Sequence, residues 1–398
     1  AFAGMTENGE KSILRWILSL HGSIQIMAII YRAREYISQG RELYFRYERR
    51  IGIVAFLFGF LLDNLTLNRI DLWLDNLVIL GYLTVTGMVV MLINAYESGR
   101  GRRIVSASTA ELLPIFLQFL FGNLFSAFVV FFMRSGTIAG SWPFILLLAS
   151  LLFGNELFRK QYARFTFHIS IYYITLFSYA ILIVPVILGR MGVWVFLVSG
   201  LASIVFIGSV ILVFSRIIPE RVRQSGKMLF ISIGGLYVLF HLMYFTHSIP
   251  PIPLTLKESG IYHSIEETTG DEYIYRLTYE PPPWYFYFKD FNPTFHWRPG
   301  EPVISYSAIF APGKLSTKVL HRWSYFNEKA DEWAVRDRLG FRITGGRDGG
   351  YRGYTAKYNL EPGKWRVDVI TERDELLGRM TFKVVEGGSA HALKTLLR

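Results

Sequence analysis

The chain of 398 residues contains no cysteine, which excludes disulfides, thiolate metal sites and a cysteine nucleophile. Charged residues are also scarce: they make up 18% of the sequence against 52% for apolar residues, and the mean hydropathy is +0.31. Soluble proteins rarely combine so much apolar content with so little charge. Because the apolar residues are grouped in long runs, the composition indicates a polytopic membrane protein with an attached soluble part.

Familiar catalytic and nucleotide-binding motifs are missing from the sequence as well. It has no His-Glu-x-x-His zinc motif and no nucleophile elbow. The run Gly-Gly-Arg-Asp-Gly-Gly at residues 345–350 lacks the Gly-Lys-Ser/Thr ending of a phosphate loop, so we interpret it as a turn. The sequence therefore assigns no catalytic residue.

The net charge of +11 does not indicate nucleic acid binding, because most basic residues of the apolar half lie in short loops between apolar runs. No basic stripe or recognised nucleic-acid motif accompanies the charge. The first residues also lack the basic flank and apolar core of a cleavable signal peptide. Membrane insertion is therefore expected to rely on the spans themselves.

Seven apolar runs predict a seven-helix transmembrane domain at residues 51–247, since each approaches the roughly 20 residues that cross a bilayer core. They cover residues 51–67, 72–95, 112–133, 142–157, 167–188, 193–214 and 228–246. Residues 1–50 precede this domain. Their stretch 12–30 has helical apolar spacing interrupted by Arg15 and His21, which indicates an amphipathic helix in the membrane interface, with a first span as the alternative.

Arginine and lysine are concentrated in alternate loops of this domain. The rich loops follow the second, fourth and sixth runs and contain Arg100, Arg102, Arg103, Arg159, Lys160, Arg164, Arg216, Arg221, Arg223 and Lys227. A basic segment also precedes the first run, and the intervening loops carry single arginines. By the positive-inside rule, the N-terminus is expected in the cytoplasm and the C-terminal domain outside.

The composition changes after residue 247. Residues 248–253 include Ile-Pro-Pro-Ile-Pro, which predicts a stiff extended linker. Residues 254–388 contain short alternating or aromatic runs separated by turn residues, and 389–398 form a tail. The candidate strands are 272–279, 302–310, 318–325, 340–344, 354–360, 364–371 and 379–385. About seven strands in a domain of this size predict an immunoglobulin-like β-sandwich.

Three segments of this domain resemble a bacterial domain of unknown function, the DUF2914 type, which typically ends multi-pass membrane proteins. They are His-Arg-Trp at 321–323, Gly-Lys-Trp-Arg-Val-Asp-Val at 363–369 and Thr-Phe-Lys-Val at 381–384. The hairpin from Gly59 to Asp71 also resembles the membrane part of those proteins. The resemblance implies a bacterial inner membrane, and the expected topology then makes the C-terminal domain extracytoplasmic, that is, periplasmic. It implies no activity or ligand that can be transferred to this chain.

The hairpin between the first two runs repeats the tetrapeptide Leu-Asp-Asn-Leu, at residues 62–65 and 74–77. In the expected topology its polar side chains lie at the outer membrane face. They are Asp63, Asn64, Arg69, Asp71, Asp75 and Asn76. Their oxygens could hold a divalent cation, the one cofactor for which the sequence offers ligands, or a lipid headgroup amine. The favoured alternative is structural: helix capping, and pairing of the acids with Arg69.

Aromatic and imidazole side chains form a second candidate binding set, in the C-terminal domain. They are Trp284, Tyr285, Tyr287, Trp297, His321 and Trp323. Aromatic platforms stack on sugar rings or lie among lipid headgroups, and the basic residue between His321 and Trp323 could form a cation–π contact. The alternative is an ordinary strand that buries alternate aromatic side chains.

Three functional hypotheses fit these features. The first is a scaffold or sensor whose C-terminal domain binds an envelope glycan, a lipid headgroup or a membrane-protein partner. The second is a transporter of a lipid or small solute with a polar gate at Asp63 and Asp75. The third is a membrane enzyme acting on a lipid-linked substrate, which is the weakest because a single pair of carboxylates is evident. Long apolar spans without convergent charges favour the first.

Overall fold

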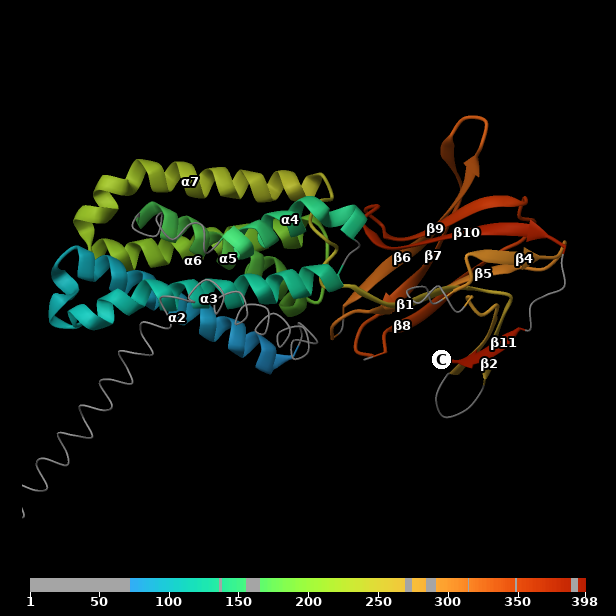
Figure 1. The fold of residues 1–398 in the computed structure, drawn as a ribbon, viewed down its shortest axis with the longest axis horizontal. Helices are drawn as coiled ribbons and strands as arrows, with labels where there is room; N and C mark the ends of the chain where they lie inside the picture. Colours follow the sequence, from blue (N-terminus) through green and yellow to red (C-terminus); the bar gives the residue numbers. More distant parts are fainter. Residues whose placement is uncertain are drawn as a thin grey trace, which may run out of the picture. The chain divides into compact units, whose positions relative to one another are not determined.

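The computed structural model describes residues 72–135, 138–154, 165–268, 274–283, 291–313, 315–347, 349–387 and 393–398. The expected N-terminal helix, the first expected span and the hairpin as far as Asp71 lie outside these ranges. Within the described residues, six α-helices come first and eleven β-strands follow (Figure 1). The change falls where the composition changes, between Phe245 and Thr255.

The helices of the described residues match six of the seven predicted runs. Five are long and apolar enough to cross a membrane, whereas the apolar part of the remaining one, Gly140–Leu152, is shorter. The described part of the chain thus has five candidate spans and does not reach the expected seven. The helices are α2 (Trp73–Glu97), α3 (Ala107–Arg134), α4 (Ile138–Gly154), α5 (Phe165–Leu188), α6 (Val193–Ile217) and α7 (Pro219–Phe245).

Helix α5 lies at the centre of the helical part, in contact with α2, α3, α6 and α7. Its Phe177 ring stacks on Phe240 of α7, with the ring centroids 4.5 Å apart. Near these rings, Gly200 of α6 allows side chains of α7 to approach the α6 backbone closely. A Cβ added there would lie 3.1 Å from Cε1 of His241 and 3.2 Å from Cε2 of Tyr237. The small residue therefore serves packing within the chain.

Replacing Gly200 by leucine is expected to destabilise the helical part by about 1–3 kcal/mol, because the added side chain would overpack these rings. Gly208 on the same helix has no neighbour within 4 Å of an added Cβ, so Gly208→Leu is the matched control with the same gain in helix propensity. The measurement is the thermal unfolding midpoint of the full chain in detergent. Equal midpoints for the two variants would contradict the packing role.

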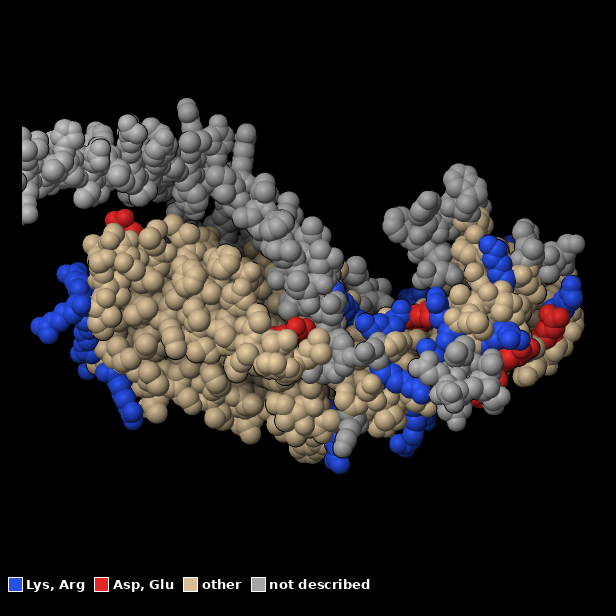
Figure 2. Space-filling view, turned by 90° about the horizontal axis from the view of Figure 1, so that it is seen from below, with Lys and Arg blue, Asp and Glu red and all other residues tan. Residues whose placement is uncertain are grey.

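Two of the predicted arginine-rich loops meet at one end of the helices. The guanidinium of Arg100 donates to the carbonyl of Ile217 at 2.7 Å, and Arg221 pairs with Glu97 at 2.6 Å. Figure 2 shows basic side chains gathered at this end. Helix α7 begins here, at Pro219, and ends at Phe245 before the linker. The β-domain is therefore attached at the helix ends opposite to the arginine-rich loops.

Three sheets make up the β-domain. The first joins β1 (Thr255–Tyr262), β5 (Val303–Phe310) and β8 (Tyr351–Lys357) in that order. The second has five strands, in the order β4 (Thr294–Trp297), β10 (Leu376–Glu386), β9 (Gly363–Thr371), β6 (Ser316–Asn327) and β7 (Glu332–Thr344). The third joins β11 (Lys394–Leu397), β3 (Ile274–Tyr279) and β2 (Ser264–Thr268).

Strand β5 is buried along its whole length because it lies between two apolar cores. Val303 and Ile309 pack with Trp323 and Trp365 of the five-stranded sheet. The intervening residues, such as Tyr306, pack instead against the sheet of β2, β3 and β11. Alternate side chains of a strand point to opposite faces, so a strand covered on both sides has apolar residues on both.

All seven predicted strands overlap observed ones, β3 and β5 to β10, although the prediction at 340–344 covers only the end of β7. The expected total of about seven is too low, because the described residues contain four more strands: β1, β2, β4 and β11. The last of these falls in the expected tail and pairs with β3. Three sheets around two cores, with a parallel pair between β4 and β10, do not confirm the immunoglobulin-like sandwich. The finding that holds is a β-rich C-terminal domain.

Candidate functional site

The outer face of the five-stranded sheet carries a dense set of basic side chains, which we call the basic face. One side of β6, β9 and β10 buries Trp323, Val367 and Phe382 in the core. Because side chains alternate, the intervening residues point outward. The basic face consists of Lys318, Arg322, Arg338, Arg342, Lys364, Arg366, Arg379 and Lys383.

Strand register places these basic residues directly opposite one another. Lys318 pairs with Arg342, Arg322 with Arg338, and Lys364 with Lys383. Like charges on opposite positions of neighbouring strands repel and destabilise a sheet. A face built in this way keeps an unfavourable electrostatic arrangement that an anionic partner would relieve.

Asp368 is the one acid among these outward positions of β9, and it is fully buried beneath three arginines. Arg379 donates from Nε to Oδ1 at 2.6 Å and from Nη2 to Oδ2 at 3.2 Å, and Arg322 donates to Oδ2 at 2.9 Å. Arg366 pairs with the same Oδ2, with its Nε at 3.5 Å. Burial by itself raises the pKa of Asp368, but hydrogen bonds from Arg379 and Arg322 and the surrounding positive charge lower it overall.

Asp374, in the turn between β9 and β10, provides the second negative charge beside this face. It pairs with Arg322 at 3.1 Å and with Arg338 at 3.2 Å. Its backbone has a φ of 61°. Aspartate adopts this left-handed conformation more readily than most residues, which suits it to the turn. Among the described residues, the eight basic residues of the basic face thus have two close acidic partners, Asp368 and Asp374.

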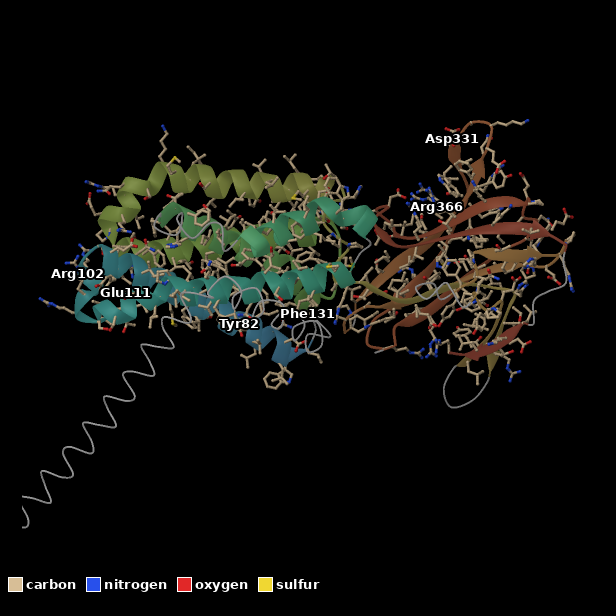
Figure 3. All side chains as sticks on the ribbon, in the orientation of Figure 1. Tyr82, Arg102, Glu111, Phe131, Asp331 and Arg366 are labelled. Carbon is tan, nitrogen blue, oxygen red and sulfur yellow. The ribbon has the colours of Figure 1, made fainter. Side chains whose placement is uncertain are left out.

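The guanidinium of Arg366 lies over an aromatic ring beside the turn of the β6–β7 hairpin. Its guanidinium carbon is 4.6 Å from the ring centroid of Trp333, a cation–π arrangement. Figure 3 labels Arg366 on the sheet and Asp331 at the tip of the hairpin. Burial lowers the pKa of Arg366; the nearby Asp368 opposes this, and Arg379 and Arg322 add to it. Arg366 shares its nearest acid, Asp368, with Arg322 and Arg379.

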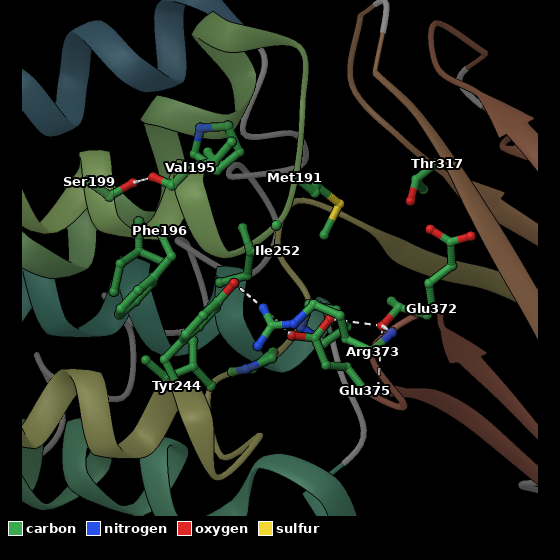
Figure 4. Close-up of a pocket in the computed structure, with 17 residues that line it drawn as sticks. Met191, Val195, Phe196, Ser199, Tyr244, Ile252, Thr317, Glu372, Arg373 and Glu375 are labelled. Carbon is green, nitrogen blue, oxygen red and sulfur yellow. Dashed lines mark hydrogen bonds and ion pairs between the residues drawn. The ribbon is translucent and has the colours of Figure 1, made fainter.

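A cavity of about 120 Å³ lies where α7 and the linker meet the turn between β9 and β10 (Figure 4). The guanidinium of Arg373 covers the ring of Tyr244 at 4.1 Å and donates to its hydroxyl. Glu375 pairs with Arg373 at 3.3 Å and accepts a hydrogen bond from Thr371. These polar groups satisfy one another, so the contact holds the turn against α7.

The predicted hairpin residues fall mostly outside the described part of the chain: Asp63, Asn64, Arg69 and Asp71 are not described. Asp75 and Asn76 lie in the first turn of α2, where Asp75 is favourably placed for the helix dipole. Asn76 donates to the carbonyl of Leu72 at 3.0 Å and accepts from the hydroxyl of Tyr179 at 3.4 Å. The cap residue, Leu72, makes no side-chain cap bond. The predicted cation site remains a hypothesis.

Some of the aromatic candidates also lie outside the described part of the chain, and the others are buried. Trp284, Tyr285 and Tyr287 lie outside the described ranges. Trp297 is 6% exposed and donates to the carbonyl of Glu301 at 2.8 Å, and Trp323 is fully buried. These two tryptophans therefore pack in the core. Arg322, between His321 and Trp323, points to the opposite face of the sheet.

His321 is also fully buried, between two hydroxyl groups. Its ring nitrogens lie 2.9 Å from Oγ of Ser307 and 2.9 Å from Oγ1 of Thr355. Burial lowers the pKa of His321 to about 3, so the ring is neutral at ordinary pH. It links the five-stranded sheet to β5 and β8 and is closed to any ligand.

Glu280 is the acceptor in a buried polar cluster at another edge of the domain. Its carboxylate accepts hydrogen bonds from His263 Nε2 and His296 Nδ1, both at 2.9 Å, and from Asn292 at 3.2 Å. The backbone N–H of His296 also donates to it, at 2.9 Å. In the described ranges, no group of three His, Asp or Glu side chains is placed to hold a metal ion.

Comparison with known families decides the class of this domain. Residues 316–384 match the family described as "Protein of unknown function (DUF2914)". The C-terminal domain is of the DUF2914 type. The matched segment runs from the start of β6 almost to the end of β10, so the DUF2914 match contains the whole basic face. It does not extend to the helices, whose resemblance to that family is not confirmed.

Other comparisons add little to this DUF2914 assignment. No curated protein matches the chain. Among solved structures, the alkylpurine DNA glycosylase of Pseudomonas fluorescens bound to DNA containing an abasic site analogue is 10% identical, over 75% of this chain and 77% of that chain. Its TM-score is 0.20, which is too low to carry any inference about this protein.

The sequence contained a signal for the basic face that motif searching did not use. In Lys-Trp-Arg-Val-Asp-Val, residues 364–369, charged and apolar side chains alternate strictly. Such alternation marks a strand with one buried and one solvated face. A similar alternation of polar and apolar residues occurs in Arg-Met-Thr-Phe-Lys-Val at 379–384. Only the pairing of these strands shows that their charged residues lie side by side.

Proposed function

We propose that this protein is a membrane-anchored scaffold or sensor whose DUF2914-type domain binds an anionic component of the cell envelope through the basic face. The observation that carries the proposal is the eight basic side chains on one outer sheet face, with Asp368 and Asp374 as their close acidic partners. Complementary electrostatic potentials steer charged partners toward a surface and orient them there. Candidate partners are a lipid headgroup, an anionic glycan or an acidic surface of another membrane protein.

The proposed location is a bacterial inner membrane, with the arginine-rich loops in the cytoplasm. Arg100, Arg221 and their neighbours gather at the helix ends opposite to the attachment of the β-domain. The positive-inside rule favours retention of that end in the cytoplasm. The basic face would then lie in the periplasm, where envelope polyanions and anionic headgroups are available.

The test is salt-dependent retention of the detergent-solubilised full chain on immobilised heparin, used as a generic polyanion. A variant with four exposed residues of the basic face replaced by Gln is expected to elute at clearly lower salt: Lys318, Arg342, Lys364 and Lys383. The control variant replaces four exposed basic residues elsewhere in the domain: Arg298, Lys329, Arg347 and Lys394. Each loses four charges, so a shift confined to the first shows a localised site. Equal elution of the two variants would contradict the proposal.

A further inference from the structure

Strand β7 forms one edge of the five-stranded sheet. It pairs with β6 along Glu332–Thr344, and no other strand of the described residues pairs with it. From Asp337 to Thr344 this pairing continues without a bulge, and the stretch contains no proline. A regular edge of this kind can accept a further strand through its outward N–H and C=O groups.

The hydrogen-bond pattern identifies the backbone groups that point to the open edge. The N–H of Gly345, directly after β7, donates to the carbonyl of Leu315 at 2.8 Å. Bonded and non-bonded positions alternate along an antiparallel pair, so every second residue counted back from Gly345 bonds to β6. The N–H and C=O groups of Arg338, Gly340 and Arg342 therefore point away from β6. In the described part of the chain, no other strand pairs with them.

Solvent reaches this edge at Gly340. Arg338, Gly340 and Arg342 are all exposed, and the exposed surface of Gly340 is backbone because a glycine has no side chain. Leu320 of β6 lies over the outer face of Gly340: a Cβ added to the glycine would be 2.5 Å from Cδ2 of Leu320. The exposed backbone is therefore that of the open edge, where an extended chain can approach.

The side chains on either side of Gly340 determine which strand the edge favours. Arg338 and Arg342 extend onto the basic face, opposite Arg322 and Lys318 of β6. Antiparallel pairing with a second copy of β7 about Gly340 would place Arg338 opposite Arg342. Like charges in opposite positions of neighbouring strands are destabilising, whereas opposite charges stabilise the pair. The edge therefore disfavours its own copy and favours an acidic strand.

We propose that β7 binds an extended acidic segment of another protein, which adds to the sheet as a further strand antiparallel to β7. This rests on the proposed anion-binding function and names its partner. The register predicts acidic residues four positions apart, opposite Arg338 and Arg342. The residue between them is aromatic, because it lies opposite Gly340. The alternate residues are apolar, because they lie beside Leu339 and Phe341 on the core side of β7.

The probe is a fluorescently labelled peptide with blocked ends and this pattern, Thr-Glu-Val-Tyr-Val-Glu-Thr. Fluorescence anisotropy with the detergent-solubilised full chain at low salt is expected to show saturable binding. The same peptide with Lys in place of both Glu is expected not to bind. Lack of saturable binding at about 100 μM protein, or equal binding of the Lys peptide, overturns the inference.

N-methylated peptides test whether the backbone pairs. In the antiparallel register the N–H groups of the two Glu point to β7, and those of the two Val point away from it. Methylation of both Glu nitrogens is expected to weaken binding by about tenfold, because two main-chain hydrogen bonds are lost. Methylation of both Val nitrogens is the matched control and should change the affinity by less than about threefold. Equal losses for the two peptides would show that no such strand forms.

Charge exchange at Arg342 tests the position and direction of the added strand. Arg342→Glu places an acid opposite Lys318, so the fold is expected to persist, while the acidic probe should bind about fivefold more weakly. Lys at the first acidic position of the probe lies opposite residue 342 and should restore binding. Lys at the second acidic position should not. Equal effects of the two Lys peptides contradict the register.

The control variant is Arg298→Glu, which changes an exposed basic residue next to β4, the opposite edge of the same sheet. It should bind the acidic probe as the unmodified chain does. A loss equal to that of Arg342→Glu overturns the inference, because it shows a diffuse electrostatic effect.

The outcomes separate this inference from the proposed function. Normal retention on heparin without peptide binding overturns the added strand and leaves the anion-binding function intact. Dimerisation of the unmodified chain that the acidic probe does not reverse identifies a second copy at the edge and also overturns it. If heparin retention and peptide binding are both missing, the proposed function itself is wrong.

Discussion

Replacing Asp368 by Asn is expected to lower the free energy of unfolding of the β-domain by about 3–5 kcal/mol, the usual cost of removing one partner from a buried ion pair. The substitution keeps the shape of the side chain but removes the one charge that Arg322, Arg366 and Arg379 share. Three guanidinium groups would then face one another across neighbouring strands. Asp368 is fully buried, so water cannot take over the role of the carboxylate.

Urea denaturation of the full chain in detergent, followed by tryptophan fluorescence, measures this effect because Trp323 and Trp365 lie in the adjacent core. Asp374→Asn is the matched control. Asp374 is 44% exposed and also pairs with arginines, so its loss should cost less than about 1 kcal/mol. A small effect at Asp368, similar to that at Asp374, would show that the arginine cluster does not depend on the buried charge.

Acid provides a second check on Asp368. Its pKa in the folded protein is lowered. The contribution of the charged form is thus fully present above the ordinary aspartate pKa of about 3.9. That contribution is lost as the pH falls through the lower, folded value. The Asn variant should lack this part of the acid sensitivity.

Replacing Glu280 by Gln is expected to cost on the order of 3 kcal/mol of unfolding free energy, the second-largest effect. Glu280 is 3% exposed and accepts four hydrogen bonds, from His263, Asn292, and the ring and backbone of His296. Glutamine offers one acceptor oxygen in place of two and turns an amide N–H₂ toward groups that are themselves donors. The cluster ties β4 to the end of β3, so its loss should loosen that edge.

The contribution of Glu280 to the free energy of unfolding falls at acidic pH. Burial alone would raise the pKa of Glu280, but the hydrogen bonds from His263 and His296 lower it from 4.5 to about 2. The stabilisation is therefore present above pH 4.5 and is lost as the pH falls from 4.5 to about 2.

Urea denaturation of the full chain at several pH values measures this loss for the wild type and for Glu280→Gln. The control is Glu386→Gln at the exposed end of β10. The wild type and the control should lose stability together between pH 4.5 and 2, while the Glu280 variant starts lower and changes less. Parallel acid curves for all three proteins would contradict the assigned role.

Local sequence patterns determined much of the architecture. The apolar runs predicted α2 to α7 closely, because a helix that crosses a membrane must be apolar over its whole length. Alternation and turn residues predicted seven of the strands. The strands that were missed are short, like β4 and β11, or, like β1, interrupt their apolar pattern with Lys257 and Glu258.

The residues of the candidate site were harder to predict from the sequence than the architecture. Aromatic residues and histidines drew attention to Trp297, His321 and Trp323, which are core residues. The residue type alone does not distinguish an exposed aromatic platform from a buried aromatic side chain, because both need large apolar rings. The arginine between His321 and Trp323 was noticed only as their neighbour, although it belongs to the opposite face.

The sequence by itself determined the long apolar helices and the β-rich C-terminal domain of the DUF2914 type, because hydropathy, turns and side-chain alternation are local properties. Only the tertiary structure decided that β5 lies between two cores and that Arg322, Arg366 and Arg379 converge on Asp368. Those relations depend on which strands pair and in what register. Residue 322 is far along the chain from residues 366 and 379, which lie on consecutive strands, and the register of β6, β9 and β10 brings all three together.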